Sequence, residues 1–187
     1  MPRKRSLIAS EWMTLDGVFD ADTMSTWFEP YQSDERIAYI KEGVFEPDAI
    51  LAGRVTYEMF EAYWPKQKND EMGIADRMNS MPKYVVSSTL KEAKWNNSTI
   101  IKGGVMEKIL DLKQQPGKDI IVFGSAALVH SLMKANLVDE FRFLVHPIVM
   151  GKGKRFFTDG MPTTKLELAR TKTFKSGVTL LVYHPAR

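Results

Sequence analysis

Along the first two-thirds of the chain, short apolar segments suited to β-strands alternate with segments of helical spacing. This alternation predicts parallel strands joined by right-handed helical crossovers. One strand, expected at residues 119–123, has the apolar run Ile-Ile-Val-Phe, which suits a sheet centre covered on both faces. The last third reads as strand almost throughout, so antiparallel strands are expected at one edge. We interpret residues 1–187 as a single α/β domain with a mixed, mostly parallel sheet.

Local patterns place the individual elements. Strands are predicted over residues 5–10, 48–52, 83–87, 98–101, 119–123, 140–149, 165–173 and 177–183. Helices are predicted over residues 25–42, 54–63, 73–79, 105–113 and 126–134. Within the first helical region, Ser33 or Asp34 is the expected N-cap, and Gly43 is the expected end.

Composition excludes several classes of function. The chain has no cysteine, which rules out disulfides, thiolate zinc sites and cysteine nucleophiles, and its histidines show no metal spacing. No stretch approaches the roughly 20 apolar residues of a membrane span, and no signal peptide is recognised, so a cytoplasmic protein is expected. The net charge of +3 is spread along the chain. A nucleic-acid partner is therefore not expected, because it would need a longer basic stripe.

Four of the expected strands end in small, hydroxylated or cationic residues. These junctions are Gly53-Arg54-Val55-Thr56, Ser87-Ser88-Thr89, Lys102-Gly103-Gly104 and Gly124-Ser125-Ala126-Ala127. The carboxyl ends of parallel strands lie along one edge of a sheet, where ligands bind. Glycine lets the backbone approach an oxygen closely, and free N–H groups at a helix start attract anions. The four junctions together predict a ligand with several phosphates, such as a dinucleotide.

Each junction alone has a plainer explanation. Glycine after a strand is commonly only a turn, and Ser-Ser-Thr is commonly a helix cap. The Gly-x-Gly-x-x-Gly fingerprint is absent after the first strand, so a dinucleotide fold here is not the standard Rossmann type.

Several stretches, in order along nearly the whole chain, carry a family resemblance. They are residues 15–18 (Leu-Asp-Gly-Val), 51–58 (Leu-Ala-Gly-Arg-Val-Thr-Tyr-Glu), 84–88 (Tyr-Val-Val-Ser-Ser), 122–128 (Val-Phe-Gly-Ser-Ala-Ala-Leu), 137–141 (Leu-Val-Asp-Glu-Phe) and 147–157 (Pro-Ile-Val-Met-Gly-Lys-Gly-Lys-Arg-Phe-Phe). They resemble the dihydrofolate reductase-like superfamily. The resemblance is closest to the reductase domain of the bifunctional riboflavin-biosynthesis deaminase/reductase and its stand-alone bacterial relatives.

The resemblance implies a three-layer α/β/α fold and an NADPH-dependent reductase of a planar heterocycle: a pteridine, dihydrofolate or a riboflavin-precursor pyrimidine. The activity would be like that of 5-amino-6-(5-phosphoribosylamino)uracil reductase or dihydrofolate reductase. A homodimer is also implied, and we expect Phe141, Phe143 and the C-terminal strands to form its apolar face. The cofactor contacts implied by the resemblance are Ala9, Gly17, Gly53, Arg54, Thr56, Ser87, Ser88, Lys102, Gly124, Ser125, Ala126 and Ala127.

These contacts divide by role in the family. Gly53, Arg54 and Thr56 would hold phosphates, and residues 124–127 would wrap the pyrophosphate. Ser87 and Ser88 would lie by the 2′-phosphate, with Arg54 and Lys102 favouring NADPH over NADH. Ala9 and the loop 15–17 would border the nicotinamide.

The chain departs from the family at three points. Dihydrofolate reductases carry a glycine pair, often with a cis peptide, where this chain has Gly124-Ser125, whose hydroxyl could serve a phosphate instead. They also place a pterin-binding carboxylate on the first long helix, where residues 25–31 offer only Glu29. The deaminase half of the riboflavin enzyme, with its cysteine-bound zinc, is missing.

Hydride transfer leaves the protein few chemical tasks beyond a closed pocket and one proton donor. Asp16 is the catalytic candidate, with a turn residue as its alternative explanation. The expected substrate pocket consists of Trp12, Trp27, Tyr57 and Trp64, for which core packing is the alternative. The alternative function is a non-catalytic NADPH-binding or nucleotide-binding protein with a regulatory role.

Overall fold

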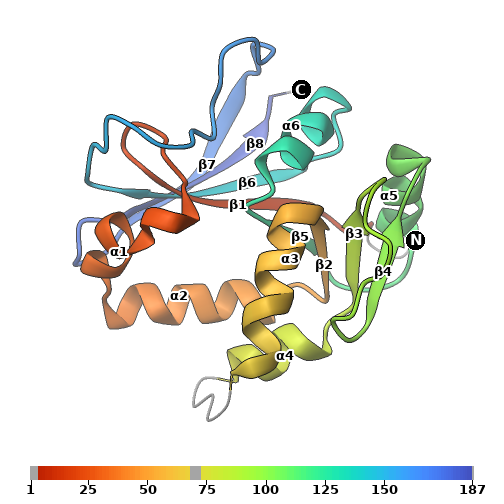
Figure 1. Ribbon diagram of the computed structural model, residues 1–187. Coiled ribbons are helices and arrows are strands. Elements are labelled where there is room, and N and C mark those ends of the chain that lie inside the picture. The colour runs from red at the N-terminus through yellow and green to blue at the C-terminus, as the bar shows by residue number, and fades with distance from the viewer. Residues whose placement is uncertain (1–3, 68–72, 187) are drawn as a thin grey trace.

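The computed structural model describes residues 4–67 and 73–186 (Figure 1). Its strands are β1 (Leu7–Thr14), β2 (Ala49–Gly53), β3 (Lys83–Val86), β4 (Ser98–Ile101), β5 (Ile120–Phe123), β6 (Glu140–His146), β7 (Leu166–Thr173) and β8 (Thr179–Pro185). Its α-helices are α1 (Met24–Trp27), α2 (Asp34–Phe45), α3 (Arg54–Tyr63), α4 (Ile74–Ser80), α5 (Val105–Gln114) and α6 (Ala126–Lys134). Three short 3-10 helices are η1 (Ala21–Thr23), η2 (Glu29–Tyr31) and η3 (Trp64–Lys66).

All eight strands form one sheet in the order β4-β3-β2-β5-β1-β6-β8-β7. The strands from β4 to β6 are parallel, whereas β8 is antiparallel to both β6 and β7. The β7–β8 turn closes where the Phe174 N–H donates to the Val178 carbonyl (2.8 Å), with Gly177 at a φ of 84°. The predicted mixed sheet with antiparallel C-terminal strands is confirmed.

Helices cover the sheet on both faces (Figure 1). Successive residues of β2 separate the two layers, because Leu51 packs with α5 and α6 while Ile50 packs with α2, α3 and α4. Both residues are at most 1 % exposed. This double burial explains why β2 (Ala-Ile-Leu-Ala-Gly) and β5 (Ile-Ile-Val-Phe) carry no polar side chain. The three-layer arrangement expected from the family resemblance is therefore present.

The element boundaries differ from the predictions in places. β1 extends to Thr14 rather than residue 10, because residues 8–14 pair with β6. The predicted helix 25–42 is broken into α1, η2 and α2, with Pro30 in η2. Ser33 caps α2 by accepting from the Arg36 N–H (3.3 Å), but the helix runs past Gly43 to Phe45. β6 ends at His146, before Pro147.

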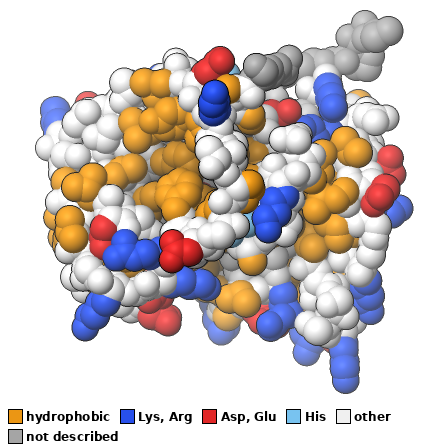
Figure 2. Space-filling view, turned by 90° about the horizontal axis from the view of Figure 1, so that it is seen from above, with side chains coloured by type: hydrophobic (Ala, Val, Ile, Leu, Met, Phe, Trp, Pro, Cys, Tyr) orange, Lys and Arg blue, Asp and Glu red, His pale blue; other side chains and the backbone are white. Residues whose placement is uncertain are grey.

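The expectation for a dimer face is wrong for two residues. Phe141 and Phe143 are 1 % and 5 % exposed within the chain, so they cannot form an external apolar face. Exposed hydrophobic side chains lie further out, at Leu168 of β7 and Phe157. Figure 2 shows hydrophobic side chains gathered in a patch on the left of the face seen from above. Among the helices of the described residues, none combines the length and apolarity of a membrane span.

Candidate active site

The carboxyl ends of β2 and β5 are tied together by side-chain hydrogen bonds. The Gly53 N–H donates to Ser125 Oγ (3.0 Å), and the Ser125 N–H donates to Thr56 Oγ1 (3.1 Å). The Ser125 hydroxyl itself donates weakly to the Phe123 carbonyl (3.4 Å). Two of the four predicted junctions therefore form one connected unit, which we call the phosphate turn: Gly53, Thr56, Gly124 and Ser125.

The backbone of the phosphate turn is left-handed at two successive residues. Gly124 and Ser125 have φ values of 57° and 58°, and the peptide bond that joins them is trans. Glycine adopts this conformation freely, whereas serine does so at a cost. The turn leads directly into α6, whose first-turn N–H groups at Ala126 and Ala127 have no acceptor within the helix. Such N–H groups, with the helix dipole, suit an anion.

The other predicted phosphate contacts follow β2, β3 and β4 along the same edge. Arg54 is exposed and forms an ion pair with Glu58 (2.8 Å), one helical turn further on. Ser88 and Lys102 are exposed, so both can reach a ligand. Ser87 is 8 % exposed, and its hydroxyl accepts from the Leu90 N–H (2.9 Å), which is the behaviour of a capping residue. Since β2, β3 and β4 are neighbours in the sheet, these groups form a row beside the phosphate turn.

The two predicted nicotinamide contacts, Ala9 and Gly17, lie in different places: one within β1 and the other in the turn beyond it. Ala9 is fully buried and pairs with Val122 and Phe141, so its side chain makes only packing contacts in this structure. Gly17 lies beyond the strand in a turn closed by the Thr14 N–H donating to the Val18 carbonyl (2.9 Å), with a φ of 78°. Cofactor contacts from Ala9 and Gly17 stay predictions.

Asp16 holds two loops together. Its carboxylate accepts from Thr14 Oγ1 (2.6 Å) and from the N–H groups of Met150 (3.1 Å) and Gly151 (2.9 Å). It also pairs with Arg155 (3.2 Å). The Thr14 hydroxyl is the main cause that lowers the pKa of Asp16 to about 2. An acid that is ionised at neutral pH has no proton to give, so this geometry favours the turn-residue explanation over proton donation.

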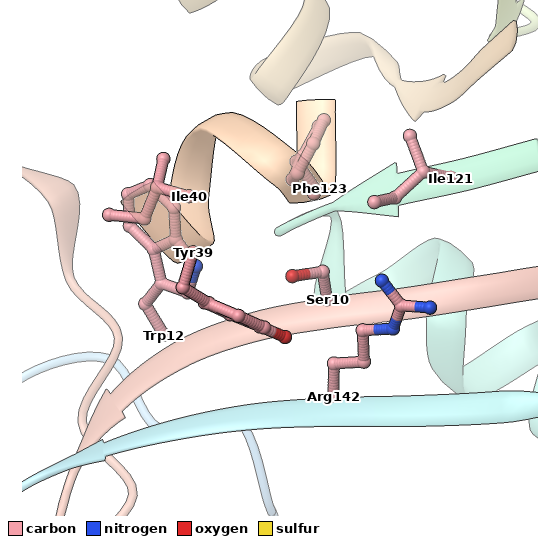
Figure 3. A pocket seen from close by; sticks show the side chains of 8 residues that line it. Ser10, Trp12, Tyr39, Ile40, Ile121, Phe123 and Arg142 are labelled. Atoms are coloured by element: carbon pink, nitrogen blue, oxygen red, sulfur yellow. The ribbon is translucent and has the colours of Figure 1, made fainter. Parts of the chain in front are cut away.

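A groove lies between α2 and the face of the sheet opposite α6. Figure 3 shows the side chains of Ser10, Tyr39 and Arg142 pointing into it. Its inner part is narrow, with a volume of about 10 Å³, which is room for about one water. It continues outward past Tyr39 and Arg142 into an open space of about 430 Å³. We call both parts together the α2 groove; its inner part is lined by Ser10, Trp12, Tyr39, Ile40, Gly43, Ile121, Phe123 and Arg142.

The α2 groove meets the phosphate turn at Phe123, the residue before Gly124. Its cation, Arg142, is held by Glu46 (2.6 Å) and Glu140 (2.5 Å), while its Nη2 has no protein partner among the described residues. These carboxylates raise the pKa of Arg142 against the effect of burial. Burial raises the pKa of Tyr39, so its hydroxyl stays protonated. The groove thus offers a fixed cation and two hydroxyl groups beside apolar walls.

Of the four aromatics predicted for the substrate pocket, Trp12 alone lines the groove, with its ring stacked on Phe28 at 4.7 Å. Trp27 is 1 % exposed and donates from Nε1 to the Asp20 carbonyl (3.0 Å). Tyr57 is equally buried and donates to Glu61 (3.0 Å). Trp64 packs against Phe60 in the core on the α3 side. Substrate contact from these three stays a prediction, and this structure gives them packing positions.

The sequence reasoning missed Ser10, Tyr39 and Arg142, and also Glu11, a fully buried carboxyl group in β1. A usable signal existed for the two charged residues. Glu11 lies between Ala9 and Met13 on one face of β1, and Arg142 lies between Phe141 and Phe143 in β6. A charged residue is rarely buried among such apolar neighbours unless it is paired.

The family model of the RibD C-terminal domain matches residues 5–180. The chain belongs to this family. It is 38 % identical over 139 residues to the uncharacterized protein YyaP of Bacillus subtilis (strain 168), which covers 73 % of each chain.

Solved structures with the same fold are more distant in sequence. A pyrimidine reductase-like protein of Corynebacterium diphtheriae has a TM-score of 0.69 at 14 % identity, over 99 % of this chain and 93 % of that one. The diaminohydroxyphosphoribosylaminopyrimidine deaminase/5-amino-6-(5-phosphoribosylamino)uracil reductase of Thermotoga maritima has a TM-score of 0.66 at 16 % identity, over 98 % and 57 %. Dihydrofolate reductase of Enterococcus faecalis, complexed with NADP(H), has a TM-score of 0.61 at 15 % identity, over 97 % of both chains. The fold is therefore dihydrofolate reductase-like, and the family supports a reductase of the riboflavin-pathway or dihydrofolate reductase-like type.

Proposed function

We propose that this protein is an NADPH-dependent reductase of a planar heterocycle. The phosphate turn carries the proposal, since it joins the ends of β2 and β5 at the start of α6, and Phe123, the residue before Gly124, lines the inner part of the α2 groove. Cofactor phosphates at one edge and a heterocycle in the adjoining groove would place the two reactants side by side.

The residues present fit the cofactor. Gly53 and Gly124 let the backbone come close to oxygen atoms, and the first turn of α6 supplies N–H donors. Arg54, Ser88 and Lys102 lie along the same edge, where they would hold the 2′-phosphate that distinguishes NADPH from NADH. When bound, NADPH supplies the hydride.

The chain's own residues would position the acceptor. Trp12 and Phe123 offer apolar and aromatic walls for a flat ring, and Tyr39, Ser10 and Arg142 offer hydrogen bonds at its margin. Arg142 is fixed by its two carboxylates, so its free Nη2 is pre-oriented toward a ligand. A riboflavin-precursor pyrimidine and a dihydropteridine both have this flat, polar-edged shape.

The decisive experiment measures NADPH binding and oxidation in sequence. NADPH at about 100 times its Kd should raise the melting temperature by about 5–10 °C above that of the ligand-free protein. The rise with NADH should be much smaller. NADPH absorbance should then fall when a pyrimidine or pteridine acceptor is added. Equal melts with NADPH, NADH and no ligand would refute the proposal.

One observation favours a second candidate, a protein that binds NADPH without turnover. The inner part of the α2 groove is almost filled by protein side chains, and Asp16, the catalytic candidate, is an ionised structural group. This candidate predicts a melt raised by NADPH with no oxidation for any acceptor tried. Acceptor-dependent oxidation above the rate without protein would exclude it.

A further inference from the structure

Glu11 is a buried acid whose carboxyl group makes no hydrogen bond within the described residues. It lies within β1, is 1 % exposed, and neither carboxyl oxygen has a hydrogen-bond partner in residues 4–67 or 73–186. Its side chain points to the α5–α6 face, because Ala9 and Met13, two residues away on either side, pack in that core. On β6 its neighbour is Phe143. A carboxyl group therefore stands in an apolar layer.

Such a group is neutral and still has hydrogen bonds to make. Burial raises the pKa of Glu11 well above its ordinary value of 4.5, which favours the protonated acid. A protonated carboxyl has one O–H donor and one carbonyl acceptor. Buried polar groups in native proteins almost always find partners, so this exception needs an explanation, and a bound ligand would supply one.

The position of Glu11 in the sheet is at the active-site edge. β5 ends at Phe123, which pairs with Ser10, while β1 continues from Glu11 to Thr14 with only β6 beside it. The next residue on the β5 side is Gly124, whose N–H donates to the Ser10 carbonyl (3.3 Å). Glu11 therefore lies one residue beyond the last β1–β5 pair, next to the phosphate turn.

The order in which a bound dinucleotide crosses the strand ends determines which half of it lies beside Glu11. This step rests on the proposed function. The cations and hydroxyls that would hold the 2′-phosphate follow β2, β3 and β4, and the phosphate turn follows β5. A dinucleotide that continues in the same direction comes next to β1. Its nicotinamide half, which carries a carboxamide, would therefore lie beside Glu11.

We propose that the Glu11 carboxyl binds the carboxamide of the nicotinamide ring. Its O–H donates to the carboxamide oxygen, and its carbonyl oxygen accepts from the carboxamide N–H, so both groups are satisfied by two hydrogen bonds. Phe156 packs on Phe143 (ring centres 5.9 Å apart) and covers this level of the sheet, so the loop that carries Phe156 must shift as the carboxamide enters.

Glu11 does not face the substrate. Ser10 and Trp12 line the α2 groove, whereas the side chain of Glu11 between them points to the opposite face. Glu11 therefore orients the cofactor and does not protonate an acceptor in the groove.

The test compares three ligands on four proteins. The ligands are NADPH, its reduced 3-acetylpyridine analogue (a methyl ketone in place of the carboxamide) and 2′,5′-ADP, which lacks the nicotinamide half. The proteins are wild type, E11L, E11Q and the matched control M13L, which changes an apolar neighbour on the same face. Calorimetry gives each Kd, and thermal melts without ligand report folding.

The proposal expects E11L to weaken NADPH binding by about 5- to 150-fold and to leave 2′,5′-ADP unchanged. E11Q, which keeps one donor and one acceptor, and M13L should bind NADPH within about threefold of wild type. Wild type should prefer NADPH over the acetyl analogue, and E11L should lose that preference.

Several results would overturn the proposal. One is an E11L protein that binds NADPH as tightly as wild type. Should E11L not fold, a wild type that binds NADPH and the acetyl analogue equally would overturn it as well. If wild type binds neither NADPH nor 2′,5′-ADP, the proposed function itself fails, which is a different result from NADPH binding that is indifferent to Glu11.

Discussion

Gly53 and Ser125 are 72 residues apart in sequence, yet the Gly53 N–H donates a 3.0 Å hydrogen bond to Ser125 Oγ. This bond fixes the end of β2 against the turn before α6. It also occupies the serine hydroxyl, which donates in turn toward the Phe123 carbonyl (3.4 Å). The groups left for an anion are therefore the N–H groups at the start of α6, and the hydroxyl acts as a brace for them.

Replacing Ser125 with alanine should loosen this brace. The Gly53 N–H would lose its acceptor, which costs about 1–2 kcal/mol of the free energy of unfolding and lowers the melting temperature by several degrees. NADPH affinity should fall as well, because the turn is no longer held. The matched control is Ser131→Ala on the exposed side of α6, where the hydroxyl donates only to the Ala127 carbonyl (3.0 Å). An S125A melt equal to that of S131A would contradict this account.

Arg54 should matter for the choice of cofactor and little for stability. Its pair with Glu58 is exposed, with 44 % and 43 % of the two side chains accessible, and such pairs contribute at most about 1 kcal/mol. Arg54→Ala should leave the melt unchanged, weaken NADPH binding about fivefold and spare NADH. Added salt should narrow the difference between the two cofactors. The control is Glu58→Gln, which breaks the ion pair with Arg54 and should not weaken NADPH binding. If R54A loses the same affinity for NADPH and for NADH, Arg54 does not bind the 2′-phosphate.

Asp16→Asn should act on stability through the loops. The carboxylate accepts from Thr14, Met150 and Gly151, and an amide cannot replace all of these bonds, so a loss of about 1–2 kcal/mol is expected. Because the folded pKa is about 2, below the ordinary 3.8, the stabilisation is present above pH 3.8 and is lost as the pH falls from about 3.8 to 2. Urea unfolding at several pH values should show this loss of unfolding free energy in wild type and not in D16N. A D16N protein with an unchanged melt but no NADPH oxidation would instead make Asp16 catalytic.

The fold could be predicted from the sequence further than the site could. Strand and helix alternation is local, so the mixed sheet was foreseeable, but β1 is lengthened by its pairing with β6, a contact far along the chain. The phosphate turn needs a bond between Gly53 and Ser125 that no local pattern encodes. The lining of the groove could not be predicted for another reason. Trp12 and Trp27 are both tryptophans in the N-terminal region, and only the direction of each side chain distinguishes a groove wall from a core residue.

His146 should make the protein lose stability as the pH falls. It is fully buried, with Nδ1 against the Met13 carbonyl (3.0 Å) and Nε2 against Arg36 (2.9 Å). Burial, with the Arg36 charge, lowers its pKa from 6.5 to about 4. Between pH 6.5 and 4, His146 is therefore protonated in the unfolded chain but not in the folded chain. The free energy of unfolding falls by about 3 kcal/mol across this range.

Urea unfolding across that range should show this loss in wild type and a flatter profile in His146→Gln. Glu11 has the opposite sign, because its raised pKa makes the folded chain less stable as the pH rises above 4.5. The difference between wild type and H146Q isolates the histidine, since Glu11 is present in both. Parallel profiles for the two proteins would show that His146 titrates normally in the folded state.

Gly43 allows the α2 groove to be blocked without touching the cofactor edge. It lies on α2, lines both parts of the groove, and an added Cβ would meet no atom within 4 Å. Gly43→Ala should therefore stabilise the protein by about 0.5–1 kcal/mol through helix propensity, with NADPH binding unchanged. Gly43→Leu should place a branched side chain in the groove and reduce kcat/KM for the heterocyclic acceptor at least about tenfold, again with NADPH affinity unchanged. The alanine variant is the control for the change in helix propensity. Full activity in G43L would show that the substrate does not bind in the α2 groove. A parallel loss of NADPH binding would show that the cofactor and substrate sites are not separate.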